Sequence, residues 1–314
     1  MNKQFNDLLP DIVNAINYNY TQSDLLLGKS DKYLPVRTTI IEILDDMKRL
    51  MFPGYFSTDR VDVTNAAYYT GQILSSLHLK LRKQVALALA YDREPGIFSS
   101  NPDVIAEAEE ICCKFFEAVP HIQEMLLLDV QAGYDGDPAA DSKEQIIFSY
   151  PGFYATFVYR VAHELYNMHV PFIPRVMTEH AHGKTGIDIN AGATIGKYFF
   201  MDHGTGIVVG ETTIIGDYVK LYQGVTLGAL STRGGQHLAG VKRHPTIEDR
   251  VTIYSNATVL GGETVIGADS VIGGGAFITN SIPANTRVSV TPPELAIKQD
   301  THAQISATDY VYEI

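Results

Sequence analysis

The chain has 314 residues, long enough for two domains with separate hydrophobic cores, and its apolar fraction of 45% is that of a globular protein. Its net charge of −12 argues against a nucleic-acid-binding protein, because no basic face is available to displace counterions from phosphates. The first residues lack the apolar segment of a secretion signal, and no apolar run is long enough to cross a bilayer. We therefore expect a cytoplasmic protein that binds neither nucleic acid nor membrane.

The first half of the chain has the residue spacing of amphipathic helices. One apolar stripe begins at Val36 and ends before Pro53, and Asn101 followed by Pro102 is a typical helix start. The predicted helices cover approximately residues 36–51, 101–117, 120–133, 151–168 and 171–180. Together they predict an all-helical N-terminal domain over residues 1–183.

The second half repeats every six positions. Glycine or asparagine is common at the fourth position of each hexad, so a hexad is typical of a short strand followed by a turn. Three such strands close a triangular coil with its buried residues on the axis, and the pattern predicts a parallel β-helix of a little over four coils at residues 184–290. Strands of a sandwich would alternate with period two instead. The first positions of the hexads are Ile189, Ile195, Met201, Ile207, Thr213, Val219 and Val225, then Ile247, Ile253, Val259, Val265, Val271 and Phe277.

One interruption of the repeat predicts an inserted loop. From Val225 to Ile247 the interval is not a multiple of six, which places a loop at residues 231–246. Long loops on regular scaffolds are commonly functional. After Pro283 the hexads stop, and residues 291–314 are predicted to form a polar C-terminal tail.

Two places carry side chains suited to catalysis or binding. His203 follows Asp202 on a rigid coil, and an imidazole that titrates near neutral pH suits a general base. Asp188 stands close to one coil earlier, where its carboxylate could orient that ring. Arg243 and His244, at the end of the loop, offer an arginine fork and a second donor to a carboxylate, although a solvated surface loop is the alternative.

Several segments together resemble the serine O-acetyltransferases, a family of the hexapeptide-repeat acyltransferase superfamily, in their longer amino-terminal form. The likeness covers roughly residues 120–282. It implies an α+β fold in which an all-helical N-terminal domain precedes a left-handed parallel β-helix with one inserted loop. The segments that carry it are Asp129-Val130-Gln131-Ala132, Asp137-Pro138-Ala139, Asp188-Ile189, Met201-Asp202-His203, Gly210-Glu211-Thr212, Gln223 to Gly228, and Arg243-His244-Pro245.

The resemblance implies transfer of acetyl from acetyl-CoA to the hydroxyl of L-serine, which gives O-acetyl-L-serine and CoA in cysteine biosynthesis. The serine hydroxyl attacks directly while His203 removes its proton and Asp188 orients the imidazole, and no metal is expected. The residues implied to bind serine are Asp137 and Asp202 for its ammonium group and Arg243 and His244 for its carboxylate. Those implied to bind acetyl-CoA are Gly228, Ala229, Arg233 and Lys242.

The resemblance also implies partners. We expect a homotrimer or a dimer of trimers, because the family builds its active site at a subunit boundary. L-cysteine differs from serine by one atom, so we expect it to act as a feedback inhibitor in the same site. The terminal Ile314 resembles the family's contact with O-acetylserine sulfhydrylase.

Three other functions are compatible with parts of this sequence. A zinc lyase of the γ-carbonic anhydrase type would need three histidines around one metal, and the candidates are His180, His182, His203, His237 and His244. Another hexapeptide acetyltransferase, acting on a sugar or an antibiotic, would share the base but not the need for Asp137. A non-enzymatic scaffold would act through its tail alone.

Overall fold

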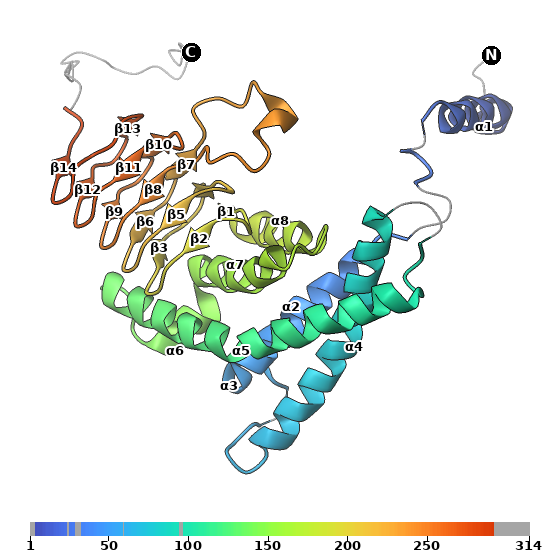
Figure 1. Ribbon diagram of the computed structural model, residues 1–314, viewed down its shortest axis with the longest axis horizontal. Helices are drawn as coiled ribbons and strands as arrows, with labels where there is room; N and C mark the ends of the chain where they lie inside the picture. Colours follow the sequence, from blue (N-terminus) through green and yellow to red (C-terminus); the bar gives the residue numbers. More distant parts are fainter. Residues whose placement is uncertain (1–3, 24, 29–32, 59, 94–96, 292–314) are drawn as a thin grey trace, which may run out of the picture.

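The computed structural model describes residues 4–291 apart from 24, 29–32, 59 and 94–96. Helices form its first half and a stack of short strands forms its second, as the sequence predicts (Figure 1). The predicted tail therefore lies outside the described residues except for its first position. The helices are α1 (Phe5–Gln22), α2 (Arg37–Met51), α3 (Pro53–Phe56), α4 (Ala66–Asp92), α5 (Pro102–Gly136), α6 (Lys143–Ser149), α7 (Pro151–Asn167) and α8 (Ile173–Thr185).

Helix α5 is continuous where two helices were predicted. Pro120 lies inside it rather than at the start of a new helix. Proline removes one main-chain donor, but Val119 and Ile122 on either side are buried in the same core. Packing along the whole helix thus outweighs the lost hydrogen bond. The continuous helix delivers Asp137, the residue that follows it, to the β-helix.

The strands form three parallel sheets, the faces of a triangular coil. The first sheet has the order β1-β4-β7-β10-β13, the second β2-β5-β8-β11 and the third β3-β6-β9-β12-β14. The strands are β1 (Asp188–Ile189), β2 (Thr194–Ile195), β3 (Phe200–Asp202), β4 (Val208–Val209), β5 (Ile214–Ile215), β6 (Lys220–Tyr222), β7 (Thr226–Gly228), β8 (Thr246–Ile247), β9 (Thr252–Ile253), β10 (Thr258–Leu260), β11 (Val265–Ile266), β12 (Val271–Ile272), β13 (Phe277–Ile278) and β14 (Arg287–Val288).

The register of the strands departs from the predicted hexads at the first coil. Ile189 pairs with Val209, 20 residues later, whereas Val209 pairs with Leu227, 18 residues later. Two extra residues therefore lie in the first coil, between β3 and β4. The prediction gave the strand position to Ile207, which is also buried. Each hexad has two inward positions, two residues apart, and both are usually apolar. A count of apolar residues every six positions therefore cannot show that the strand position has moved from Ile207 to Val209.

The last three hexads were placed one residue too early. Ile247 pairs with Ile266, so the inward residue is Ile266 and not Val265. The same correction applies to Val271 and Phe277, and Phe277 is 71% exposed. An extra residue at the corner between β10 and β11, where Gly261 has φ +107°, accounts for the shift.

Helix α7 attaches the helical part to the first coil of the β-helix. Tyr159 donates a hydrogen bond to the carbonyl of Ala193 at 2.6 Å. Arg160 forms a buried ion pair with Asp129 of α5 and also donates to the carbonyl of Gly196 at 2.9 Å. These bonds satisfy main-chain oxygens near the end of the solenoid, which has no further coil to pair with.

The inserted loop interrupts the stack between β7 and β8, and it projects from the body of the β-helix (Figure 1). It contains one short 3-10 helix at Gly235–Leu238, and its predicted last residue, Thr246, already begins β8. None of the helices in the described part of the chain is long and apolar enough to span a membrane.

Candidate functional site

His203 lies at the corner between β3 and β4, where the two extra residues of the first coil are found. Its backbone has φ +60°, and Gly204 and Gly206 beside it also have positive φ. This bulged corner leaves the imidazole 71% exposed, with Nε2 3.7 Å from a carboxylate oxygen of Asp202. An exposed ring on a fixed backbone can receive a proton from a bound substrate.

Asp188 lies in β1, next to this corner. It is paired with Val208, and its N–H donates to the carbonyl of Ile207 at 2.9 Å. Its carboxylate makes no hydrogen bond or ion pair with another described residue, so the predicted contact with His203 is not formed here. The neighbouring placement keeps Asp188 as a candidate for orienting the ring.

Asp137 comes to the same corner from the end of α5. Its carboxylate accepts a hydrogen bond from the Tyr150 hydroxyl at 2.6 Å and another from the Ala139 N–H at 2.8 Å. These two bonds, with weaker help from the charges of His203 and Lys220, lower the pKa of Asp137 below its usual value. The carboxylate is therefore ionised at neutral pH and able to bind an ammonium group.

Lys220 connects these acidic groups. Its ammonium donates to the carbonyl of Gly136, at the end of α5, and lies 3.8 Å from Asp202. It also lies 5.1 Å from the ring centre of Phe200 and 4.8 Å from that of Tyr222. Lys220 thus holds the end of α5, and with it Asp137, beside Asp202.

Arg243 and His244 lie at a different corner, where strands of the first sheet lead into the second. The guanidinium of Arg243 donates to Glu211 at 2.5 Å, and Tyr166 donates to the same carboxylate at 3.0 Å. Burial is the largest single effect and alone would raise the pKa of Glu211, but the hydrogen bonds from Arg243 and Tyr166 and the positive charge of Arg243 together outweigh it, and the pKa is lowered. The guanidinium is therefore fixed by an ionised partner.

The imidazole of His244 is buried and its tautomer follows from its partners. The N–H of Thr212 donates to Nδ1 at 3.0 Å, so we assign the proton to Nε2. Burial, with the nearby charge of Arg243, lowers the pKa of His244 to about 4. A side chain at Gly210 would collide with this ring, since its Cβ would lie 2.0 Å from Cδ2. His244 is therefore a neutral donor through Nε2.

The two clusters occupy opposite edges of one sheet. His203 precedes β4, at the edge where the strands of that sheet begin, whereas Glu211 and Arg243 lie at the edge where its strands end. No hydrogen bond or ion pair among the described residues joins the two clusters. One chain therefore presents two separate clusters, which we call half-sites: an acidic half-site of Asp137, Asp202 and His203, and a carboxylate half-site, named for the group predicted to bind there, of Arg243 and His244.

Of the residues predicted to bind acetyl-CoA, Lys242 contacts the second cluster. Gly228 ends β7 and Ala229 follows it, while Lys242 donates to the carbonyl of His244. Arg233 is exposed in the loop. The five histidines of the zinc alternative are spread over α8, the bulged corner, the 3-10 helix and the end of the loop. Within the described residues, no group of three or more histidine, cysteine or acidic side chains could hold a metal ion.

Four residues of these clusters were not predicted: Tyr150, Lys220, Glu211 and Thr212. The one signal in the sequence for the first cluster is the eight-residue interval from Met201 to Val209, which a count of apolar residues misses because Ile207 also fits a six-residue interval. A break in a strict repeat marks a bulge, and bulges are common beside active sites. The contacts of Tyr150 and Lys220 depend on chain segments far apart in sequence and left no such signal.

A comparison with models of known protein families finds no match for this chain. A search of curated proteins finds a plasmid-encoded serine acetyltransferase of Synechococcus elongatus that is 42% identical over 267 residues, covering 83% of this chain and 83% of that protein. The match spans the helical part as well as the β-helix. It is long enough to identify the family.

Solved structures give the same result. Serine acetyltransferase isoform 3 of Entamoeba histolytica, solved in complex with cysteine, is 31% identical with a TM-score of 0.70, over 94% of this chain and 96% of that chain. The serine acetyltransferase of Brucella abortus, in complex with coenzyme A, is 28% identical with a TM-score of 0.52, over 80% and 93%. The similarity in fold confirms the predicted left-handed β-helix.

Proposed function

The chain belongs to the serine acetyltransferase family, and we propose that its bulged corner supplies the general base for acetyl transfer from acetyl-CoA to L-serine. The observation that carries this proposal is the meeting of His203, Asp202 and Asp137 at one corner, from two separate parts of the fold. Family membership decides against the zinc lyase, the sugar or antibiotic acetyltransferase and the non-enzymatic scaffold.

The serine hydroxyl is itself the nucleophile in this reaction, so the enzyme needs to supply a base that removes its proton. The serine oxygen attacks the thioester carbonyl while Nε2 or Nδ1 of His203 accepts the hydroxyl proton. The tetrahedral intermediate then expels the thiolate of CoA, the protonated His203 returns its proton to that sulfur, and O-acetyl-L-serine and CoA are released. The thioester is already activated, so no acyl-enzyme is required. Asp188 is proposed to orient the imidazole once substrate is bound.

L-serine is a zwitterion, so its ammonium group needs a negatively charged partner and its carboxylate a positively charged one. Asp137 and Asp202 are proposed to bind the ammonium group, and Arg243 with the Nε2–H of His244 the carboxylate. Because the two half-sites lie at opposite edges of a sheet, we propose that a second copy of the chain supplies Arg243 and His244. A cyclic homotrimer would complete three such sites, and two trimers could pair through their helical parts.

Acetyl-CoA is proposed to lie along the β-helix beside the inserted loop. Gly228 and Ala229 would border the pantetheine arm, and a main-chain N–H near Gly228 would stabilise the oxyanion. Lys242 and Arg233 offer positive charge to the phosphates of CoA. The support for this placement is the exposure of the loop and its position beside the carboxylate half-site.

L-cysteine is proposed to compete with serine, since it carries the same ammonium and carboxylate groups. The related Entamoeba enzyme was solved with cysteine bound. Millimolar cysteine should therefore raise the apparent KM for serine, and an unchanged KM would refute this. A sulfhydrylase is proposed as partner through Ile314, which lies outside the described residues. Deletion of Ile314 should abolish that complex and leave turnover unchanged.

The direct test is release of free CoA thiol from acetyl-CoA with L-serine. His203→Ala should lower kcat by roughly 10²- to 10⁴-fold, the range for loss of a general base. His121→Ala, an exposed histidine on α5, is the matched control and should retain full activity. Release with a different acceptor but not with serine would keep the base and refute the substrate.

A further inference from the structure

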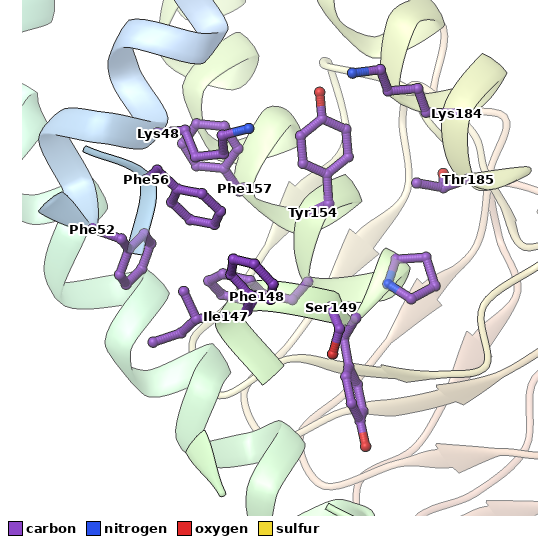
Figure 2. Close-up of a pocket in the computed structure, with 13 residues that line it drawn as sticks. Lys48, Phe52, Phe56, Ile147, Phe148, Ser149, Tyr154, Phe157, Lys184 and Thr185 are labelled. Atoms are coloured by element: carbon purple, nitrogen blue, oxygen red, sulfur yellow. The ribbon is translucent and has the colours of Figure 1, made fainter. Parts of the chain in front are cut away.

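A cavity of about 250 Å³ lies in the helical part, between α2, α3, α6, α7 and α8. Figure 2 shows its lining, in which aromatic rings dominate. Two of them, Phe56 and Phe148, are stacked with ring centres 6.1 Å apart. Phe148 is nonetheless 68% exposed. The mouth of the cavity thus presents the exposed ring of Phe148, against which a second aromatic ring can pack.

Two lysines complete the lining. The ammonium of Lys48 lies 4.8 Å from the ring centre of Phe56, and that of Lys184 lies 5.5 Å from that of Tyr154. Figure 2 shows the two lysines on either side of Tyr154. Lys184 makes no ion pair with a described residue, and the partner of Lys48 is the partly exposed Asp45, at 3.4 Å. Two ammonium groups beside aromatic walls are complementary to an aromatic ring that carries an anionic group.

The cavity touches the proposed active site at two points. Tyr150 lines it and donates to Asp137 at 2.6 Å. Thr185 also lines it, and the carbonyl of the next residue, Gly186, accepts from the N–H of Gly206 in the bulged corner at 2.8 Å. A ligand in the cavity would therefore contact Tyr150, which binds Asp137 of the acidic half-site, and Thr185, which precedes the residue bonded to the corner that carries His203.

We propose that this cavity is an effector site for a small aromatic carboxylate. The ring inserts between Phe148 and Tyr154, the carboxylate binds the ammonium group of Lys184, and Lys48 adds a second positive charge on the other side of Tyr154. A ligand in the cavity displaces Tyr150. Because Tyr150 donates a hydrogen bond to Asp137, this displacement also changes the position of the Asp137 carboxylate and hence the affinity for serine. Binding stands on the cavity alone, whereas the effect on serine rests on the proposed function.

The absence of tryptophan from the sequence makes binding simple to measure. Indole-3-acetate is the probe, followed by its own fluorescence anisotropy at a wavelength that tyrosine does not absorb. We expect saturable binding that Lys184→Gln weakens by about tenfold, the usual effect of losing one charged hydrogen bond. Lys197→Gln removes an exposed lysine of the β-helix and should bind as the wild type does. Phe148→Ser, at an exposed position, should also weaken binding.

Three results would overturn the effector site. One is no saturable signal with the wild-type chain, and another is equal affinity in Lys184→Gln and Lys197→Gln. The third is equal affinity for the neutral indole-3-acetamide, which would remove the role of the two lysines. Coupling is tested separately, by the KM for serine with and without saturating indole-3-acetate. An unchanged KM refutes coupling, while absent turnover with serine would refute the proposed function and leave the binding result standing.

Discussion

At the scale of single residues, His244 shows how burial selects a chemical role. Its ring is 8% exposed and accepts a hydrogen bond from the Thr212 N–H. The lowered pKa keeps the imidazole neutral at physiological pH, so it adds no positive charge to that of Arg243 in the proposed carboxylate half-site. A neutral donor beside one cation also avoids the repulsion of two buried positive charges.

This burial predicts a dependence of stability on pH. The pKa of His244 in the folded chain is about 4, below the ordinary histidine value of 6.5, so between these values the unfolded chain binds a proton that the folded chain excludes. The contribution to stability is present above the upper value and is lost as pH falls toward the lower one, by up to about 3 kcal/mol. Urea unfolding at neutral and acidic pH measures it.

The comparison needs two variants. His244→Asn keeps an acceptor for Thr212 but does not titrate, so it should lose less stability on acidification than the wild type does. His182→Asn, a half-exposed position on α8, should behave as the wild type. Identical losses in wild type and His244→Asn would contradict the argument.

At the scale of elements, α7 ties the helical part to the β-helix through donors on one face. Tyr159, Arg160 and His163 donate to main-chain carbonyls of the first coil or its corners. Arg160 also forms its ion pair with Asp129, which in turn accepts from the N–H of Phe199 at 3.0 Å. The pair thus fixes α5, α7 and the residue before β3 relative to one another, and β3 leads directly to the bulged corner.

Breaking the buried ion pair between Arg160 and Asp129 should destabilise the folded state strongly. Arg160→Met leaves the carboxylate of Asp129 buried without its partner, and we expect a loss of about 3–5 kcal/mol in the free energy of unfolding. The double variant Asp129→Leu with Arg160→Met should recover part of that loss, since no unpaired charge remains. Urea unfolding of the four members of this cycle gives the coupling. Strictly additive losses would show that the two residues act independently.

At the scale of the whole molecule, the separation of His203 from Arg243 supports the proposal that several chains assemble. The acidic half-site needs the helical part, because Asp137 and Tyr150 come from it. The carboxylate half-site needs the loop and the edge of the sheet on the far side of β4. A substrate that contacts both requires the proposed second copy, so catalysis should depend on oligomerisation.

Complementation between two inactive variants tests this dependence. His203→Ala and Arg243→Ala should each be inactive alone. When the two chains are co-expressed at equal levels, a cyclic assembly in which each site draws on two neighbours should regain about a quarter of the wild-type sites. Expression of either variant alone is the control. No recovered activity in the mixed assembly would place each site within one chain.

The sequence by itself determined the β-helix, because a six-residue repeat admits no other regular packing of its apolar positions. It also located His203, Asp188, Arg243 and His244 as candidates, through their place on that repeat and the resemblance that they carry. These inferences depend on local spacing, which a single chain records directly. The fold class was confirmed, while the roles of the residues remain proposals.

Only the tertiary structure decided the register of the strands and which distant segments of the chain contact one another. The inward positions Ile207 and Val209 are both apolar, so the count could not show that the first coil is two residues longer than the next. Pro120 could not reveal a continuous α5, since packing on both sides compensates for its missing donor. The contacts of Lys220 with the end of α5 and the split into two half-sites arise from segments distant in sequence. Such contacts depend on how whole elements pack, which no local pattern encodes.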